Sequence, residues 1–137
     1  MGKCVLLVDD HESVRLGLRR AFESSGFSCV EATHGAHAVA LTSDFVPDLI
    51  VTDLSMPVMN GLDAATILRK RLPDTPIILY TMHTSEGVER IAAAAGITAV
   101  VSKSDPVRDL LSKANTLVKD ALSVSPDYHG APRGLKP

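Results

Sequence analysis

The sequence lacks the features that mark several large classes of protein. Its net charge over 137 residues is only −2, so it has no basic excess for neutralising nucleic-acid phosphates. Its longest apolar runs, such as Cys4 to Val8 and Ile77 to Tyr80, are far too short to cross a bilayer. No basic stretch followed by an apolar run opens the chain. We therefore expect no direct nucleic-acid binding, no membrane insertion and no secretion.

Cysteines and the common nucleotide-binding motifs are equally scarce. The two cysteines, Cys4 and Cys29, lack C-x-x-C spacing, and we interpret them as small apolar residues of a protein in the reducing cytoplasm. The chain contains no G-x-x-x-x-G-K-[ST] motif, no G-x-G-x-x-G after its first apolar run and no G-x-S-x-G motif. These absences argue against a P-loop, a dinucleotide site and a serine-hydrolase elbow.

What the sequence does contain is a regular alternation of short apolar runs and helical patterns. The runs lie at residues 4–8, 27–32, 48–52, 76–80 and 98–102. After each run, apolar residues recur at the spacing of one face of a helix. This βα alternation, repeated five times, predicts an α/β fold with a doubly wound, five-stranded parallel sheet.

The end of the chain breaks this pattern. Residues 123–137 contain three prolines, two glycines and two serines, a composition typical of a linker. We therefore expect a single domain over residues 1–122, followed by a linker-like or disordered tail over 123–137.

Polar residues collect where the predicted strands end, which is where open α/β sheets bind their ligands. They are Asp9 and Asp10 after the first strand, Asp53 after the third, Thr81 after the fourth and Lys103 after the fifth. The second strand is followed only by Thr33 and His34, as expected of a strand away from the site. The sequence thus predicts one site at the carboxyl edge of the sheet.

Three carboxylates at one edge need a counter-charge. Two bare charges about 5 Å apart repel by roughly 3 kcal/mol at an effective dielectric constant near 20. Mg²⁺ would relieve this repulsion, because it binds carboxylates together with water and phosphate oxygens. A carboxylate can also attack phosphorus, with Mg²⁺ and an ammonium stabilising the charge. Helix capping alone would not explain why a hydroxyl and a lysine lie at the same edge, so we predict a Mg²⁺-dependent phosphoryl site.

Four segments carry a resemblance to a known family. They are VLLVDD (5–10), VTDLSMPVMNGLDA (51–64), IILYT (77–81) and SK (102–103). Over roughly residues 3–122 the chain resembles the receiver domain of two-component response regulators. The segments DDHESVRLGL (9–18) and LRKRLPDTPIILYTMH (68–83) resemble the NarL/FixJ-type subfamily. The resemblance implies a flavodoxin-like (βα)5 fold with strand order 2-1-3-4-5. Members of this subfamily usually carry a C-terminal helix-turn-helix domain that binds DNA.

The resemblance also implies a role for each site residue. Asp53 would accept a phosphoryl group from a histidine kinase, while Thr81 and Lys103 would contact that group. The implied Mg²⁺ ligands are Asp9, Asp10, Asp53 and the backbone carbonyl of Ser55. One position departs from the family pattern: Val100 stands where an aromatic switch residue is usual, so we assign no aromatic switch.

These observations favour a phosphorylation-controlled signalling module over a dedicated enzyme, although a receiver takes part in phosphotransfer and autodephosphorylation. Its output surface would comprise residues 86–122, and it would control transcription through an output domain of a longer chain or act on a separate partner protein. A receiver homodimer is also possible under this reading. The tail and the subfamily match favour a receiver cut from a longer regulator.

Two other functions stay open. A Mg²⁺-dependent aspartate-nucleophile phosphohydrolase is disfavoured, because the haloacid dehalogenase group needs a second acid two residues after the nucleophile, where this chain has Ser55. A constitutive interaction domain is disfavoured by the complete set of polar residues. We interpret the basic run Arg69-Lys70-Arg71 as solvated surface. The arginines Arg15, Arg19 and Arg20 form either a solvated helix face or a surface on which a kinase could dock.

Overall fold

The computed structural model describes residues 2–54, 59–82 and 84–124, the last three by their backbone only. The strands are β1 (Lys3–Val8), β2 (Phe27–Ala32), β3 (Leu49–Thr52), β4 (Ile77–Thr81) and β5 (Ala99–Ser102). The helices are α1 (Glu12–Ser24), α2 (Gly35–Leu41), α3 (Gly61–Arg71), α4 (Glu86–Ala94) and α5 (Val107–Val124).

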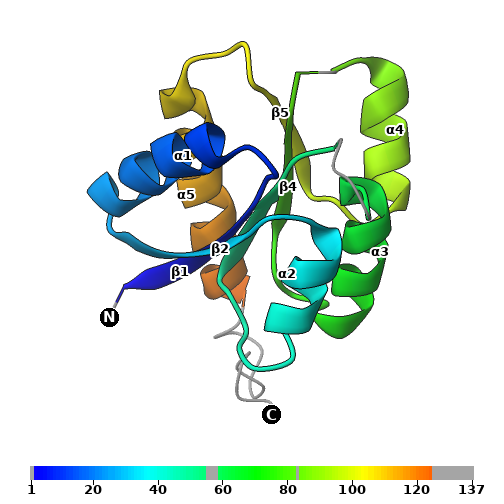
Figure 1. Ribbon diagram of the computed structural model, residues 1–137, viewed down its shortest axis with the longest axis horizontal. Coiled ribbons are helices and arrows are strands. Elements are labelled where there is room, and N and C mark those ends of the chain that lie inside the picture. The colour runs from blue at the N-terminus through cyan, green and yellow to red at the C-terminus, as the bar shows by residue number, and fades with distance from the viewer. Residues whose placement is uncertain (1, 55–58, 83, 125–137) are drawn as a thin grey trace.

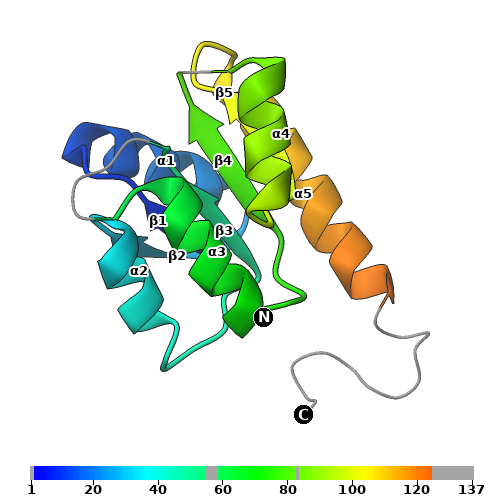
Figure 2. The same cartoon turned by 90° about the vertical axis from the view of Figure 1, so that its right-hand side faces the viewer.

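The strands form one parallel sheet in the order β2-β1-β3-β4-β5. Helices α1 and α5 cover one face of this sheet, and α2, α3 and α4 cover the other (Figures 1 and 2). The prediction of a doubly wound, five-stranded parallel sheet with strand order 2-1-3-4-5 is confirmed.

Alternation along the central strands divides the core into two layers. Val5 and Leu7 of β1 pack with residues of α1 and α5, whereas Leu6 and Val8 pack toward α2, α3 and α4. All four are buried, because a parallel strand with helices on both faces has no exposed side. The continuous apolar runs of the sequence are therefore the strands that lie inside the sheet.

Side chains at both ends of α3 hydrogen-bond to the backbone. Asn60 caps its first turn, where the side-chain oxygen accepts hydrogen bonds from the amides of Leu62 and Asp63, both at 2.9 Å. At the other end, the Arg69 guanidinium donates to the carbonyl oxygens of Gly96 at 3.0 Å, Leu72 at 2.9 Å and Pro73 at 3.0 Å.

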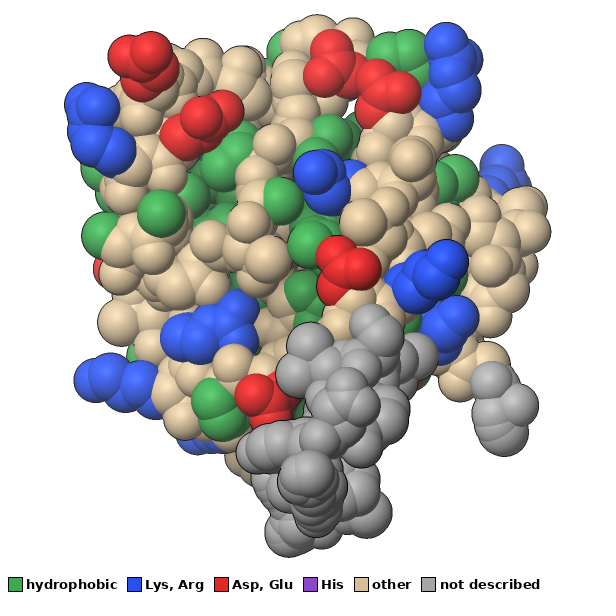
Figure 3. Space-filling view, turned by 180° about the vertical axis from the view of Figure 1, so that it is seen from behind, with side chains coloured by type: hydrophobic (Ala, Val, Ile, Leu, Met, Phe, Trp, Pro, Cys, Tyr) green, Lys and Arg blue, Asp and Glu red, His purple; other side chains and the backbone are tan. Residues whose placement is uncertain are grey.

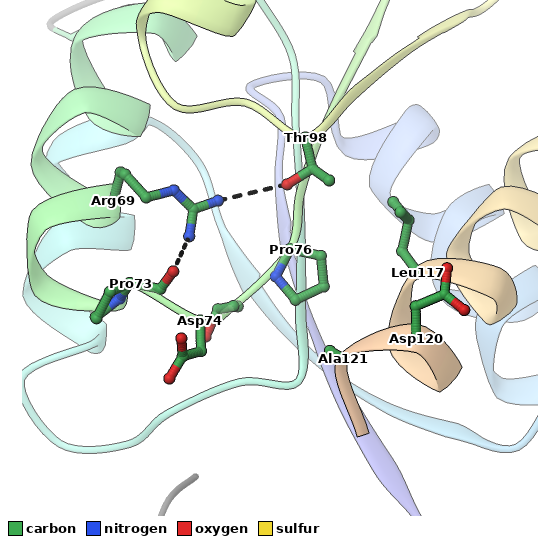
Figure 4. A pocket seen from close by; sticks show the side chains of 9 residues that line it. Arg69, Pro73, Asp74, Pro76, Thr98, Leu117, Asp120 and Ala121 are labelled. Carbon is green, nitrogen blue, oxygen red and sulfur yellow. Dashed lines mark hydrogen bonds between the residues drawn. The ribbon is translucent and has the colours of Figure 1, made fainter. Parts of the chain in front are cut away.

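Arg69 borders a pocket between the start of β4 and the last turns of α5, where it points toward Thr98 and Pro73 (Figure 4). Arg71 donates to the carbonyl oxygen of Val39 at 2.7 Å and so joins α3 to α2. The interpretation of 69–71 as solvated surface is therefore wrong for Arg69, which is partly buried, whereas Lys70 and Arg71 are exposed as expected. Of these three residues, Lys70 makes no side-chain hydrogen bond or ion pair within the part of the chain described here.

The surface and the helices add two observations. On the face shown in Figure 3, basic and acidic side chains are interspersed rather than gathered into a patch of one sign. Among the described helices, none combines the length and the apolar composition needed to cross a bilayer.

Cys4 and Cys29 are half-buried free thiols.

Candidate functional site

The site begins where β1 and β3 end side by side. Val8 pairs with Thr52 in the sheet, and the amide of Asp53 donates to the carbonyl of Val8 at 3.0 Å. Asp9 and Asp53 are thereby placed next to one another at the carboxyl edge. Both are largely buried, with 2% and 7% of their surfaces exposed. Two acidic residues that are 44 positions apart in the sequence thus lie side by side at the end of the sheet.

Lys103 connects these two carboxylates. Its Nζ lies 3.1 Å from Oδ2 of Asp9 and 3.4 Å from Oδ1 of Asp53. The lysine is held in place by its backbone, whose amide donates to the carbonyl of Thr81 at 2.8 Å. Thr81 itself is fully buried at the end of β4. The structure therefore brings together residues from the ends of four different strands.

Asp10 and His11 complete an acidic cluster. The His11 amide donates to Oδ1 of Asp9 at 2.9 Å, and Nδ1 of His11 lies 3.2 Å from Oδ1 of Asp10. One potential ligand atom from each of Asp9, Asp10, His11 and Asp53 lies within 4.8 Å of the others. The Asp10 side chain is 29% exposed, in contrast to 3% for Asp9. One carboxylate thus faces inward and the next faces outward.

Burial and charge act in opposite directions on the pKa values in this cluster. Burial raises the pKa of Asp53, the Lys103 ammonium lowers it in part, and the charge of Asp9 raises it again. For Lys103, burial lowers the pKa, but the hydrogen bond and charge of Asp9 together with Asp53 outweigh burial and raise it. The charged form of Lys103 is therefore stabilised, and ionising Asp53 costs more than it would in water.

The donor set fits a small, hard cation. The cluster contains three carboxylates, and the Lys103 ammonium pairs with two of them, so the cluster carries an uncompensated negative charge when all three are ionised. Its ligand atoms are mainly carboxylate oxygens, which Mg²⁺ prefers. Ser55, whose carbonyl completes the ligand set implied by the family resemblance, lies outside the described residues.

Two further residues support the geometry of the site. A Cβ atom on Gly61 would overlap the backbone carbonyl oxygen of Asp53, so α3 begins closer to the site than any other residue type would allow. Arg15 donates to the backbone carbonyl of Asp9 at 2.8 Å and so reaches the site from α1. In the sequence, Arg15 stands in a basic stretch that suggested exposed surface. The sequence does not show which face of α1 lies against the loop that follows β1.

The chain belongs to a known family. Residues 5–115 match the response regulator receiver domain. The recognition of a receiver domain from four short segments is thus confirmed, and so is its function as the receiver of a response regulator. Such a domain is a signalling domain.

Relatives of this chain are regulators of about twice the matched length. The chain is 33% identical over 125 residues to the response regulator UvrY of Escherichia coli strain K12, covering 90% of this chain and 57% of UvrY. It is 34% identical over 102 residues to the transcriptional activator protein ExaE of Pseudomonas putida, covering 73% of this chain and 48% of ExaE. The chain therefore spans about half the length of these relatives.

A solved structure shows the same fold with ligands. The response regulator TrrA of Thermotoga maritima, determined in complex with Mg²⁺ and BeF, superposes with a TM-score of 0.77 at 29% sequence identity. The match covers 84% of this chain and 98% of TrrA.

Proposed function

We propose that Asp53 is the phosphoacceptor of this receiver, which takes its phosphoryl group from the phosphohistidine of a histidine kinase. Receiver domains of response regulators interact with such kinases. The observation that carries the proposal is the position of Asp53, which lies beside Asp9 and 3.4 Å from the Lys103 ammonium. A carboxylate in this environment meets a cation on one side and an acidic cluster on the other.

Each side chain has a distinct role in the proposed transfer. The ionised Asp53 carboxylate attacks phosphorus, the P–N bond of the phosphohistidine breaks, and the imidazole leaves with the electron pair of that bond. The Lys103 ammonium and the Thr81 hydroxyl donate hydrogen bonds to phosphoryl oxygens. When bound, Mg²⁺ supplies positive charge that stabilises the phosphoryl oxygens.

The residues that would hold Mg²⁺ are Asp9, Asp10, Asp53 and the backbone carbonyl of Ser55. The clustering of the three carboxylates supports the first three, and the TrrA complex shows that a protein of this fold takes up Mg²⁺ with BeF. The free thiols of Cys4 and Cys29 fit the reducing cytoplasm, where we place the phosphoryl transfer.

The readout of phosphorylation is part of the same proposal. We assign receiver function to residues 1–122, output to the surface formed by residues 86–122, and a linker role to 123–137. The output reaches transcription through a further domain or a separate partner protein, with a receiver homodimer as one possible form. The similarity to ExaE, which is named a transcriptional activator, supports control of transcription as the output. Position 100 holds valine, which packs half-buried against the core, so this position supplies no aromatic rotamer to the readout.

The test is covalent labelling by a small phosphodonor. Intact-mass spectrometry after incubation with acetyl phosphate and Mg²⁺ should show the addition of one phosphoryl group to the wild type and none to Asp53→Asn. Asp63→Asn, which makes the same change at an exposed site in α3, should label like the wild type. Equal labelling of wild type and Asp53→Asn would refute the assignment of Asp53.

A further inference from the structure

Arg15 of α1 ties the acidic pair to the edge strand of the sheet. Its Nη1 donates to the backbone carbonyl oxygen of Asp9 at 2.8 Å, and its Nε donates to Oε1 of Glu31 on β2 at 2.9 Å. Only 13% of the Arg15 side chain is exposed. The strand that contributes no residue to the site directly therefore supports it through Glu31.

The Glu31 carboxylate orients Arg15 by accepting a hydrogen bond from its guanidinium. Its second carboxylate oxygen accepts a hydrogen bond from Nη1 of Arg19 at 2.6 Å, so both oxygens of the carboxylate are engaged by guanidinium groups. The hydrogen bond from Arg15 is the main cause that lowers the pKa of Glu31. A planar fork of donors suits this arrangement, because one guanidinium can serve a carboxylate and a carbonyl in fixed directions.

The carbonyl that Arg15 contacts controls the geometry of two candidate ligands. The oxygen of Asp9 lies in the plane of the peptide bond that joins Asp9 to Asp10. Fixing this oxygen fixes the rotation of the peptide plane, and with it the direction of Asp10 relative to the buried carboxylate of Asp9. Since Asp9 is 2% exposed, loss of Arg15 would also leave its carbonyl without the donor that the structure shows for it.

We propose that Arg15 is a positioning residue for divalent-cation binding, which acts through the Asp9 backbone and is itself oriented by Glu31. This inference rests on the proposed Mg²⁺ site. It differs from the interpretation of Arg15 as solvated surface or kinase contact, because it assigns the arginine an effect on metal affinity in the isolated domain.

The experiment measures Mg²⁺ affinity directly, by calorimetric titration of the unphosphorylated protein. Arg15→Met keeps most of the apolar stem and removes both hydrogen bonds. We expect the dissociation constant for Mg²⁺ to rise about tenfold, the lower end of the 10- to 100-fold effects of residues that orient metal ligands. Glu31→Gln, which keeps an acceptor but loses the charge, should raise it about threefold.

Two matched variants separate positioning from loss of charge. Arg19→Met removes the same charge and one Glu31 contact but no contact with Asp9, and Arg20→Met removes the charge at an exposed position of α1. Both should change the dissociation constant by less than twofold. Circular dichroism shows that each titrated variant is folded, and Glu31→Gln decides the matter if Arg15→Met does not fold.

The outcomes distinguish this inference from the proposed function. An affinity for Mg²⁺ that is equal in Arg15→Met and Arg19→Met, or that does not change in Glu31→Gln, would overturn the positioning role. Absence of Mg²⁺ binding by the wild type would overturn it too. Labelling by acetyl phosphate is scored separately, so a wild type that binds Mg²⁺ but is not phosphorylated would refute the phosphoacceptor proposal alone.

Discussion

Lys103 at the end of β5 lies 3.4 Å from Asp53 at the end of β3, measured from Nζ to Oδ1, although β4 lies between their strands. The Lys103 side chain reaches across the end of β4, and its Nζ also lies 3.1 Å from Oδ2 of Asp9. A single ammonium therefore serves two buried carboxylates, and it does not fully offset the cost of burying Asp53.

Asp53→Asn should stabilise the protein when no divalent cation is present. The folded state raises the pKa of Asp53, so its ionisation opposes folding, and the neutral amide should increase the free energy of unfolding by about 1 kcal/mol at pH 7. Urea denaturation with a chelator present measures the difference.

The pH dependence gives the sign of this effect. A group whose pKa is raised in the folded state contributes stability below its unfolded pKa, about 3.9 for aspartate, and loses that contribution as pH rises through the folded pKa. The advantage of Asp53→Asn should therefore be absent near pH 3 and grow as pH rises above 4. An advantage that is largest at pH 3 would contradict this electrostatic explanation.

Mg²⁺ should stabilise the wild type and make it more stable than Asp53→Asn. A cation at 100 times its dissociation constant adds about 2.7 kcal/mol to the free energy of unfolding. Asp9→Asn and Asp53→Asn each remove one candidate ligand and should gain much less, whereas Asp63→Asn should respond like the wild type. Thermal unfolding with and without MgCl₂ checks this, and an equal gain in all four proteins would place the cation elsewhere.

Gly61→Ala should destabilise the protein by about 3 kcal/mol. The added methyl group would overlap the carbonyl oxygen of Asp53, so α3 must move away from the site. Gly17→Ala is the matched control, because a Cβ there meets nothing within 4 Å on the exposed side of α1. That variant should gain about 0.5–1 kcal/mol, since alanine favours the helix. Equal effects in urea denaturation would show that the close approach at Gly61 is not required.

Arg69→Met should cost about 2 kcal/mol, whereas Lys70→Met should change stability by less than about 0.5 kcal/mol. The guanidinium of Arg69 donates to the carbonyl oxygens of Leu72, Pro73 and Gly96, and all three hydrogen bonds would be lost. The two variants remove the same charge from adjacent positions. Denaturation curves that coincide for both variants would mean that the hydrogen bonds of Arg69 contribute nothing to the free energy of unfolding.

Much of this architecture could be predicted because its signals are local. Continuous apolar runs identified the buried strands, since a strand covered on both faces has no polar side. The alternation of strands with helical patterns gave the parallel sheet, and the carboxyl ends of its strands located Asp9, Asp53 and Lys103 on one edge. For the basic residues the same reasoning failed: Arg15 and Arg69 looked like surface but hold backbone carbonyls.

The sequence by itself determined which residues form strands and helices, because periodicity and capping depend on neighbours within a few positions. It also determined that a carboxylate, a hydroxyl and an ammonium follow successive strands. Only the tertiary structure decided that Lys103 pairs with both Asp9 and Asp53, that Glu31 orients Arg15, and that Gly61 touches the Asp53 backbone. These contacts depend on the register of strands and on the rotation of helices against the sheet, which are fixed by packing of the whole core.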